Sequence, residues 1–275
     1  MDFSLLIPTK DRVDILLDTI KFYIHKKYDG KIIIFDSSSD ENANKLKKEI
    51  SNLNLNFSIK IYNITALPFG AISVMSDNID TQYVAFSGDD DYFIPENLKF
   101  FVNYLVDNPS YFGVNGNAVH LSKSDNSYTY QDINSYDQKE LLIDDPNKRL
   151  NTLLENYKVP LFSIVRKNVF IDLIKYVPVK EKSKNLSRQI IDEILISCLY
   201  AISGKIKHLN YDHLIRIGHE TNNKTYSFKD DSLIIKTNTY KFLKETLKDY
   251  HLSINKNQEY YFENVINNFL NNLSK

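Results

Sequence analysis

The sequence predicts an α/β fold: a mostly parallel, Rossmann-like sheet flanked by helices and followed by a C-terminal helical tail. Short apolar runs that suit buried strands alternate with segments of helical period through the first 110 residues. This alternation requires right-handed crossovers, which place helices on both faces of a parallel sheet. With 275 residues, 43% of them hydrophobic, the chain can bury a large core.

The first half supplies four strands and four helices. Strands are expected over residues 3–7, 31–35, 57–62 and 83–86. Helices are expected over residues 13–28, 41–52, 69–79 and 97–106. Pro8 is expected to stop the first strand, and Asp29-Gly30 to end the first helix.

The pattern loosens in the second half. Further strands are expected over residues 111–121, 160–165 and 207–217, and further helices over 148–157, 168–176 and 187–203. Residues 122–140 are polar and show no clear period, and residues 232–275 are amphipathic and helical, with a break near 255–257. We therefore expect one domain over residues 1–231, in halves 1–120 and 121–231, and a tail over 232–275.

Composition excludes several classes of protein. A formal net charge of −1 argues against an electrostatic grip on nucleic acid. Cys198 is the single cysteine, so neither a disulfide framework nor a thiolate zinc site is expected. The N-terminal residues lack the pattern of a signal peptide, and no window reads as a membrane span. A cytoplasmic location is the expectation.

Three consecutive carboxylates, Asp89, Asp90 and Asp91, follow the fourth predicted strand after Ser87-Gly88. Like charges side by side repel one another unless a cation offsets them. The carboxyl end of a central parallel strand opens on a ligand crevice, and hard carboxylate oxygens suit Mg²⁺ or Mn²⁺ bound together with phosphates. The alternative is a solvated acidic turn that caps the following helix.

Asp36 ends the second predicted strand. A carboxylate there can accept a hydrogen bond from a ribose hydroxyl or a uracil N–H. A dinucleotide site would require a glycine-rich turn after the first strand, and residues 8–12 contain no glycine. An Asx turn or helix cap made with the following serines is an equal alternative for Asp36.

Two acids, Asp192 and Glu193, lie early in the helix expected over 187–203. On a helical wheel Asp192 borders the apolar stripe and Glu193 points away from it, so Asp192 is the better candidate for a general base. The alternative is that both acids only favour the helix dipole. Farther on, Arg216 and His219 belong to a basic loop that suits a diphosphate, although a lone loop histidine is more often simply solvated.

Taken together, these segments resemble family 2 glycosyltransferases of the GT-A fold over residues 3–225. Leu6-Ile7-Pro8-Thr9-Lys10-Asp11-Arg12 is similar to the family's IPTYNR start, and Ile33 to Asp40 to its VVDDGSTD segment. Phe86 to Pro95 resembles the DxD element, and Arg216-Ile217-Gly218-His219 an RxH element. The resemblance implies a nucleotide-sugar site at Pro8, Thr9, Asp11, Arg12, Asp36, Ser38, Gly70, Asp89, Asp90 and Arg216, a metal site at Asp91 and His219, and catalytic residues Asp192 and Glu193.

The resemblance also implies an activity, namely inverting, Mn²⁺- or Mg²⁺-dependent transfer from a nucleotide diphosphate sugar, with a UDP-sugar favoured. The acceptor is expected to be a glycan or a lipid-linked molecule, in surface glycan or polysaccharide synthesis. A sugar-nucleotide-binding protein without turnover and a nucleotidyltransferase are the alternatives. The tail at 232–275 could pack on the domain, form a homodimer or lie on a membrane surface, and its apolar stripe favours packing.

Overall fold

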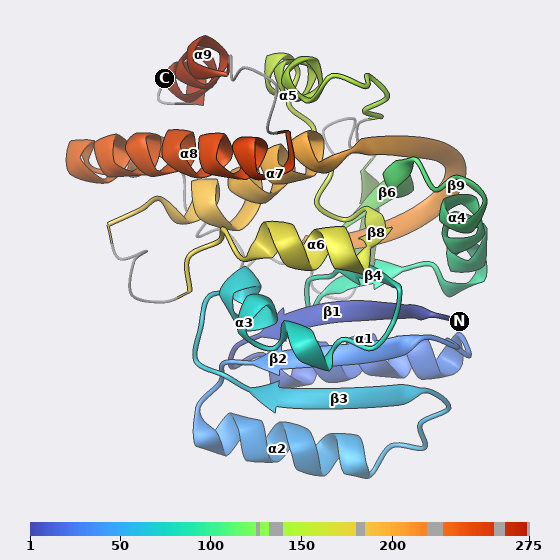
Figure 1. The fold of residues 1–275 in the computed structure, drawn as a ribbon. Coiled ribbons are helices and arrows are strands. Elements are labelled where there is room, and N and C mark those ends of the chain that lie inside the picture. The colour runs from blue at the N-terminus through green and yellow to red at the C-terminus, as the bar shows by residue number, and fades with distance from the viewer. Residues whose placement is uncertain (125–126, 132–139, 180–184, 219–227, 256–261, 274–275) are drawn as a thin grey trace.

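The computed structural model describes residues 1–124, 127–131, 140–179, 185–218, 228–255 and 262–273. A mixed sheet lies at its centre and runs in the order β3-β2-β1-β4-β8-β6-β9-β5, with β7 paired to β6 (Figure 1). Its strands are β1 (Phe3–Thr9), β2 (Lys31–Asp36), β3 (Ser58–Asn63), β4 (Tyr83–Phe86), β5 (Asp91–Phe93), β6 (Tyr111–Ser124), β7 (Ser127–Gln131), β8 (Ile164–Arg166) and β9 (Lys205–Gly218).

Strands β3, β2, β1 and β4 form a wholly parallel half. Strands β1, β2 and β4 are almost continuously apolar because helices cover both faces, and β2 is buried from Ile32 to Asp36. The edge strand β3 alternates apolar and polar residues and is only partly buried. In register, Thr9 at the end of β1 lies opposite Asp36 at the end of β2. The carboxyl ends therefore share one edge of the sheet, as the sequence predicted.

The other half of the sheet is mixed. Strand β8 is antiparallel to both β4 and β6, whereas β6 and β9 run parallel. Strand β5 pairs antiparallel with β9 and sets Asp91 opposite Arg216. This pairing brings Arg216, which is 125 residues farther along the chain, next to the acidic residue Asp91.

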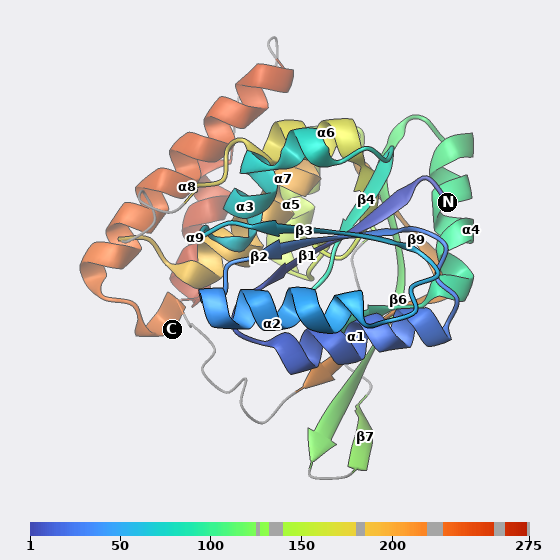
Figure 2. The ribbon, with the colours of Figure 1, turned by 90° about the horizontal axis from the view of Figure 1, so that it is seen from below.

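Helices cover both faces of the sheet. They are α1 (Val13–His25), α2 (Asp40–Ser51), α3 (Pro68–Val74), α4 (Pro95–Asp107), α5 (Pro146–Glu155), α6 (Lys167–Ile174), α7 (Leu195–Ser203), α8 (Leu233–Ile254) and α9 (Glu263–Leu273). Figure 2 shows α1 and α2 on one face of the parallel strands and α3, α6 and α7 on the other. The tail forms two helices, of which α8 packs against α7 and α9 against α5. The predicted fold class and the helical tail are thus confirmed, and no helix in the described ranges has the length and hydropathy needed to cross a bilayer.

A buried arginine joins α5 to α7. Arg149 is 5% exposed, and its guanidinium donates to the carbonyls of Ala201 and Ile202, at 2.7 and 3.0 Å, at the C-terminal end of α7. It also donates to the carbonyls of Ile143 and Asp144, which precede α5. The last carbonyls of a helix have no partner within it, so Arg149 caps α7 and fixes α5 beside it.

Several predicted boundaries were wrong. Strand β1 continues through Pro8. The carbonyl of Leu6 points toward β4 and accepts from the N–H of Ser87, and Pro8, two residues later, faces the same side. The last β1–β4 pair is Leu6 with Phe86, so the missing N–H of Pro8 removes no hydrogen bond of the sheet. Helix α3 stops at Val74, and a 3₁₀ turn follows at Ser76–Asn78, where polar side chains compete for backbone hydrogen bonds.

The structure also differs from the prediction at one strand boundary, in two short strands and within one helix. Strand β8 begins at Ile164 rather than residue 160, since Pro160 and Ser163 form a turn closed by a 3.0 Å backbone hydrogen bond. Strands β5 and β7 were not predicted, because three and five residues are too short for a clear period. The helix expected over 187–203 contains a π-turn at Ile190–Ile194 before α7.

Candidate active site

The acidic triplet lies in a tight turn between β4 and β5. The backbone N–H of Gly88 donates to Asp91 Oδ2 at 3.2 Å. A Cβ on Gly88 would lie 2.6 Å from that oxygen, so only glycine allows this approach. Ser87 donates to the backbone carbonyl of Gly88 at 3.0 Å. The Ser-Gly pair seen in the sequence therefore shapes the turn that presents the three carboxylates.

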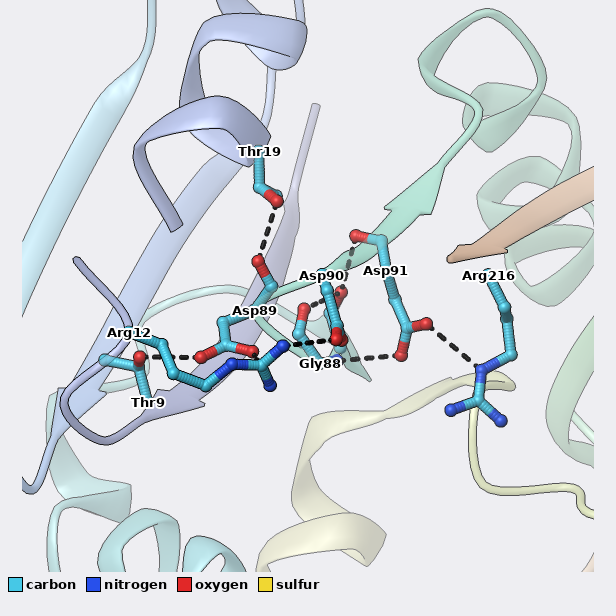
Figure 3. Close-up of polar contacts among 9 residues, drawn as sticks. Thr9, Arg12, Thr19, Gly88, Asp89, Asp90, Asp91 and Arg216 are labelled. Carbon is cyan, nitrogen blue, oxygen red and sulfur yellow. Dashed lines mark hydrogen bonds and ion pairs between the residues drawn. The ribbon is translucent and has the colours of Figure 1, made fainter. Parts of the chain in front are cut away.

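Arg12, in the loop after β1, binds two of these carboxylates (Figure 3). Its guanidinium contacts Asp89 Oδ1 at 2.7 Å and Asp90 Oδ2 at 2.5 Å. Thr9 donates to Asp89 Oδ2 at 2.7 Å, and Thr19 on α1 donates to the Asp89 carbonyl at 2.7 Å. The loop after β1 and the acidic turn are thus held together by charge-assisted hydrogen bonds.

Asp91 is bound by a second arginine. Arg216 donates from Nε to Asp91 Oδ1 at 3.1 Å, and its guanidinium lies 4.6 Å from the centre of the Phe162 ring. Figure 3 shows Arg12 and Arg216 approaching the triplet from opposite sides. Asp91 is 2% exposed, so its carboxylate is almost fully removed from water, whereas the Arg216 side chain stays 26% exposed.

These arginines supply the positive charge that the sequence analysis assigned to a cation. Burial raises the pKa of Asp89 to about 6, and Arg12 opposes that rise. Burial also raises the pKa of Asp91, and Arg216 opposes it. Within the described ranges, no group of three or more His, Cys, Asp or Glu side chains is arranged to hold a metal ion. Metal binding therefore stays a prediction, and its second candidate, His219, lies outside the described residues.

Asp36 is buried at the end of β2, with 1% of its surface exposed. Its Oδ1 accepts from the N–H of Ser38 at 2.9 Å, and its Oδ2 accepts from the Asn63 amide at 3.3 Å. The first contact is the Asx turn that the sequence allowed. Asp36 shares its edge of the sheet with Thr9, and Thr9 contacts the triplet. Recognition of a base or ribose by Asp36 stays a prediction.

Asp11 joins the loops after β1 and β2. Its φ of 54° is left-handed, which is uncommon for a residue with a side chain. Its N–H donates to Ser38 Oγ at 2.7 Å, and its Oδ1 accepts from Ser39 and from Asn42 at 2.9 Å. The Asn42 amide and the Ser39 N–H lower the pKa of Asp11. Asp11, Arg12 and Ser38 therefore meet on one rim, beside Asp36.

Gly70 lies on α3, where packing explains it. A Cβ at this position would lie 2.9 Å from Val179 Cα and 3.2 Å from the Pro178 carbonyl. The glycine thus lets residues 178–179 approach α3. Its predicted part in nucleotide binding stays a prediction.

The two candidate bases differ in their partners. Arg188, one turn earlier, donates to Asp192 Oδ2 from Nε at 2.7 Å and contacts the same oxygen from a terminal nitrogen at 2.5 Å. Glu193 Oε1 accepts from the Tyr157 hydroxyl at 3.1 Å. Burial raises the pKa of both acids. Arg188 opposes this for Asp192, and Tyr157 and Arg216 oppose it for Glu193.

The helical wheel was wrong for Glu193. It predicted a side chain directed to water, whereas Glu193 is partly buried and lies within the electrostatic reach of Arg216. A wheel assumes 100° per residue, and the π-turn at Ile190–Ile194 departs from that spacing.

Several residues that contact the site were not predicted from the sequence, namely Thr19, Tyr157, Phe162 and Arg188. Arg188 had a usable signal, because it precedes Asp192 by four residues in a helical segment. The others had none, since each contacts the site across a long separation in the chain.

The chain matches the model of a known protein family. The family model described as "Glycosyl transferase family 2" matches residues 4–174, a range that includes the acidic turn but neither Glu193 nor Arg216. A search of curated proteins gave no match.

Among solved structures, S. aureus TarS has a similar fold. TarS 1–349 in complex with UDP-GlcNAc is 16% identical, with a TM-score of 0.57, over 99% of this chain and 80% of that one. The complex with UDP is 16% identical, with a TM-score of 0.58, over 99% and 70%. A longer TarS structure is 18% identical, with a TM-score of 0.53, over 92% of this chain but only 44% of that one.

Proposed function

The chain belongs to glycosyl transferase family 2, and we propose that it moves a sugar from a nucleotide diphosphate sugar to a hydroxyl acceptor with inversion at the anomeric carbon. The observation that carries this proposal is the convergence of Asp36, the acidic triplet and Arg216 at one edge of the sheet. A UDP-sugar is the favoured donor, because structures of TarS with the same fold contain UDP-GlcNAc or UDP. We place the activity in surface glycan or polysaccharide synthesis, with a glycan or lipid-linked acceptor.

The donor would lie along the rim formed by the loops after β1, β2 and β4. Asp36 would accept from the base or the ribose, and the carboxylates held by Arg12 would accept from ribose hydroxyls. Arg216, between Asp91 and the predicted donor site, would face the diphosphate with a guanidinium suited to paired oxygens. The remaining residues assigned to the donor are Pro8, Thr9, Asp11, Ser38 and Gly70.

Asp91 fits a metal ion in chemical type, because Mg²⁺ and Mn²⁺ commonly use one or two carboxylates together with substrate phosphates. We propose that Asp91 holds the ion, with His219 as the second ligand. When bound, the ion would offset negative charge on the departing diphosphate.

One acid of the Asp192–Glu193 pair would accept the proton of the acceptor hydroxyl. The hydroxyl oxygen would bond to the anomeric carbon as the bond from that carbon to the diphosphate breaks. Burial supports this role, since a carboxyl with a raised pKa is a stronger base once ionised. Asp192 was the first candidate from the sequence, and Glu193 is the second.

The test is release of UDP from UDP-sugars, combined with UDP binding by calorimetry. Asp36→Asn should weaken UDP binding about tenfold, equivalent to about 1.4 kcal/mol, whereas Asp40→Asn, at an exposed position beginning α2, should not. Binding without UDP release would favour the sugar-nucleotide-binding alternative, and pyrophosphate release from a nucleoside triphosphate a nucleotidyltransferase. If no UDP-sugar binds or is turned over, the proposal is wrong.

A further inference from the structure

The tail helix α9 contacts the surroundings of Glu193. Phe269 on α9 is buried and lies 5.4 Å, centre to centre, from the ring of Tyr157. The Tyr157 hydroxyl donates to Glu193 Oε1 at 3.1 Å. A residue near the C-terminal end of the chain is therefore one side chain away from a candidate base.

The hydrogen bonds around Tyr157 assign its proton to the carboxylate. Ser197 Oγ lies 3.0 Å from the Tyr157 oxygen, and it donates to the backbone carbonyl of Glu193 at 2.9 Å. With the serine proton used there, the tyrosine proton is left for the ionised Glu193, which forms the stronger, charge-assisted bond. Tyr157 and Ser197 together fix both the side chain and the backbone of Glu193.

Glu193 is better placed than Asp192 to act at the donor. Asp192 is bound by Arg188 within its own helical segment. Glu193 instead accepts its hydrogen bond from Tyr157, and Arg216, which pairs with Asp91, opposes the rise that burial causes in the pKa of Glu193. A proton acceptor must lie beside the anomeric carbon, which is bonded to the diphosphate that Arg216 is proposed to face.

Tyr157 depends on packing for its position. It lies two residues beyond the end of α5, where no helical hydrogen bond orients it. Arg149 fixes α5 to α7, and α9 packs on α5 and buries Ile266, Phe269 and Leu270. The Phe269 ring is therefore the contact by which α9 limits the rotation of Tyr157.

We propose that Glu193 is the proton acceptor of the transfer and that α9 is a positioning element for it: Phe269 orients Tyr157, and Tyr157 holds the carboxylate toward the acceptor hydroxyl. This inference rests on the proposed function. It assigns the tail a part in the reaction rather than in docking to another molecule. Tyr157 and Phe269 are positioning residues, since neither is expected to touch the substrate.

The first experiment measures UDP release from the UDP-sugar that the wild type turns over fastest. Glu193→Gln should lower kcat at least 100-fold, about the contribution of a general base, and Asp192→Asn should lower it much less. Tyr157→Phe keeps the ring and should lower kcat about tenfold with an unchanged KM for the donor. The control is Tyr176→Phe, a partly buried tyrosine that packs on Tyr250.

The pH profile separates positioning from a purely structural role. The charged and titratable groups around Glu193 are Arg216 on β9, Tyr157 beyond α5, and Asp192 and Arg188 on its own segment. Loss of the Tyr157 hydrogen bond destabilises the ionised carboxylate and raises its pKa. The acid limb of the kcat profile should therefore move to higher pH in Tyr157→Phe. A variant that is only less well folded would lose amplitude without that movement.

Phe269→Leu should lower kcat and move the acid limb of its pH profile in the same directions as Tyr157→Phe, but by less. Asn268→Ala, at the exposed neighbouring position, should leave kcat and the acid limb unchanged. Near wild-type kcat in Glu193→Gln, or an unmoved acid limb in Tyr157→Phe, would overturn this inference while leaving the proposed function intact. If the wild type releases no UDP from any UDP-sugar, both fail together.

Discussion

His213 on β9 should make the protein sensitive to acid. Its side chain has no exposed surface, and the ring centres of Phe93 and Phe101 each lie 4.9 Å from the centre of its imidazole. Burial, with a smaller effect from His208, lowers the pKa of His213 to about 3. The imidazole is therefore neutral in the folded protein at pH values well above 3.

The sign and size of the effect follow from linkage. An unfolded histidine has a pKa of about 6.5, so below that pH the unfolded chain takes up a proton that the folded protein does not. The free energy of unfolding must then fall as the pH falls. With about 1.4 kcal/mol for each pH unit below 6.5, His213 should cost about 3 kcal/mol of stability at pH 4.5.

Urea denaturation at pH 7.5, 6 and 4.5 measures this cost when the wild type is compared with His213→Leu. Leucine is of similar size and does not titrate, so any packing penalty should be the same at each pH, and other titrating groups cancel in the difference. The variant should gain about 3 kcal/mol on the wild type between pH 7.5 and 4.5. His25→Leu, at an exposed position on α1, is the control and should follow the wild type. A difference that stays constant with pH would refute the reasoning.

Two further predictions concern the α5–α7 contact and the metal. Arg149→Met should lower the free energy of unfolding by about 3 kcal/mol, because two carbonyls at the end of α7 lose their partner, and urea denaturation should show no such loss in the exposed control Lys148→Met. Calorimetry should show tighter binding of a UDP-sugar with Mn²⁺ than without it, and Asp91→Ala should abolish the difference. Equal affinity with and without Mn²⁺ in the wild type would contradict the metal assignment.

The parallel half of the sheet could be predicted because the burial of its central strands determines which residues they contain. A strand covered on both faces must be apolar along its whole length, as in β1 and β2. Polar residues at the ends of such strands then meet at one edge. Asp36 and the acidic triplet were therefore placed together correctly from local sequence alone.

The partners of those acids could not be predicted. Arg216 reaches Asp91 through the antiparallel pairing of β5 with β9, and a three-residue strand leaves no period in the sequence. Tyr157 and Glu193 meet because α5 packs beside α7, a contact between segments that are 36 residues apart. The π-turn was also not predicted, since its residues fit an ordinary helix, and Glu193 within it is partly buried rather than directed to water.

Because of these long-range contacts, the structure of the site depends on both halves of the sheet. Asp91 lies in the first half of the chain, and the guanidinium that pairs with it comes from β9 in the second half. Without that half Asp91 would lose both this pair and much of its cover. Burying it without Arg216 would leave an uncompensated charge, which typically costs about 3–5 kcal/mol. The acidic turn can therefore take its described form only when β9 has docked. Although most residues predicted to bind the nucleotide sugar lie before Asp91, Arg216 is on β9, and we expect the site to form and unfold together with the second half of the sheet.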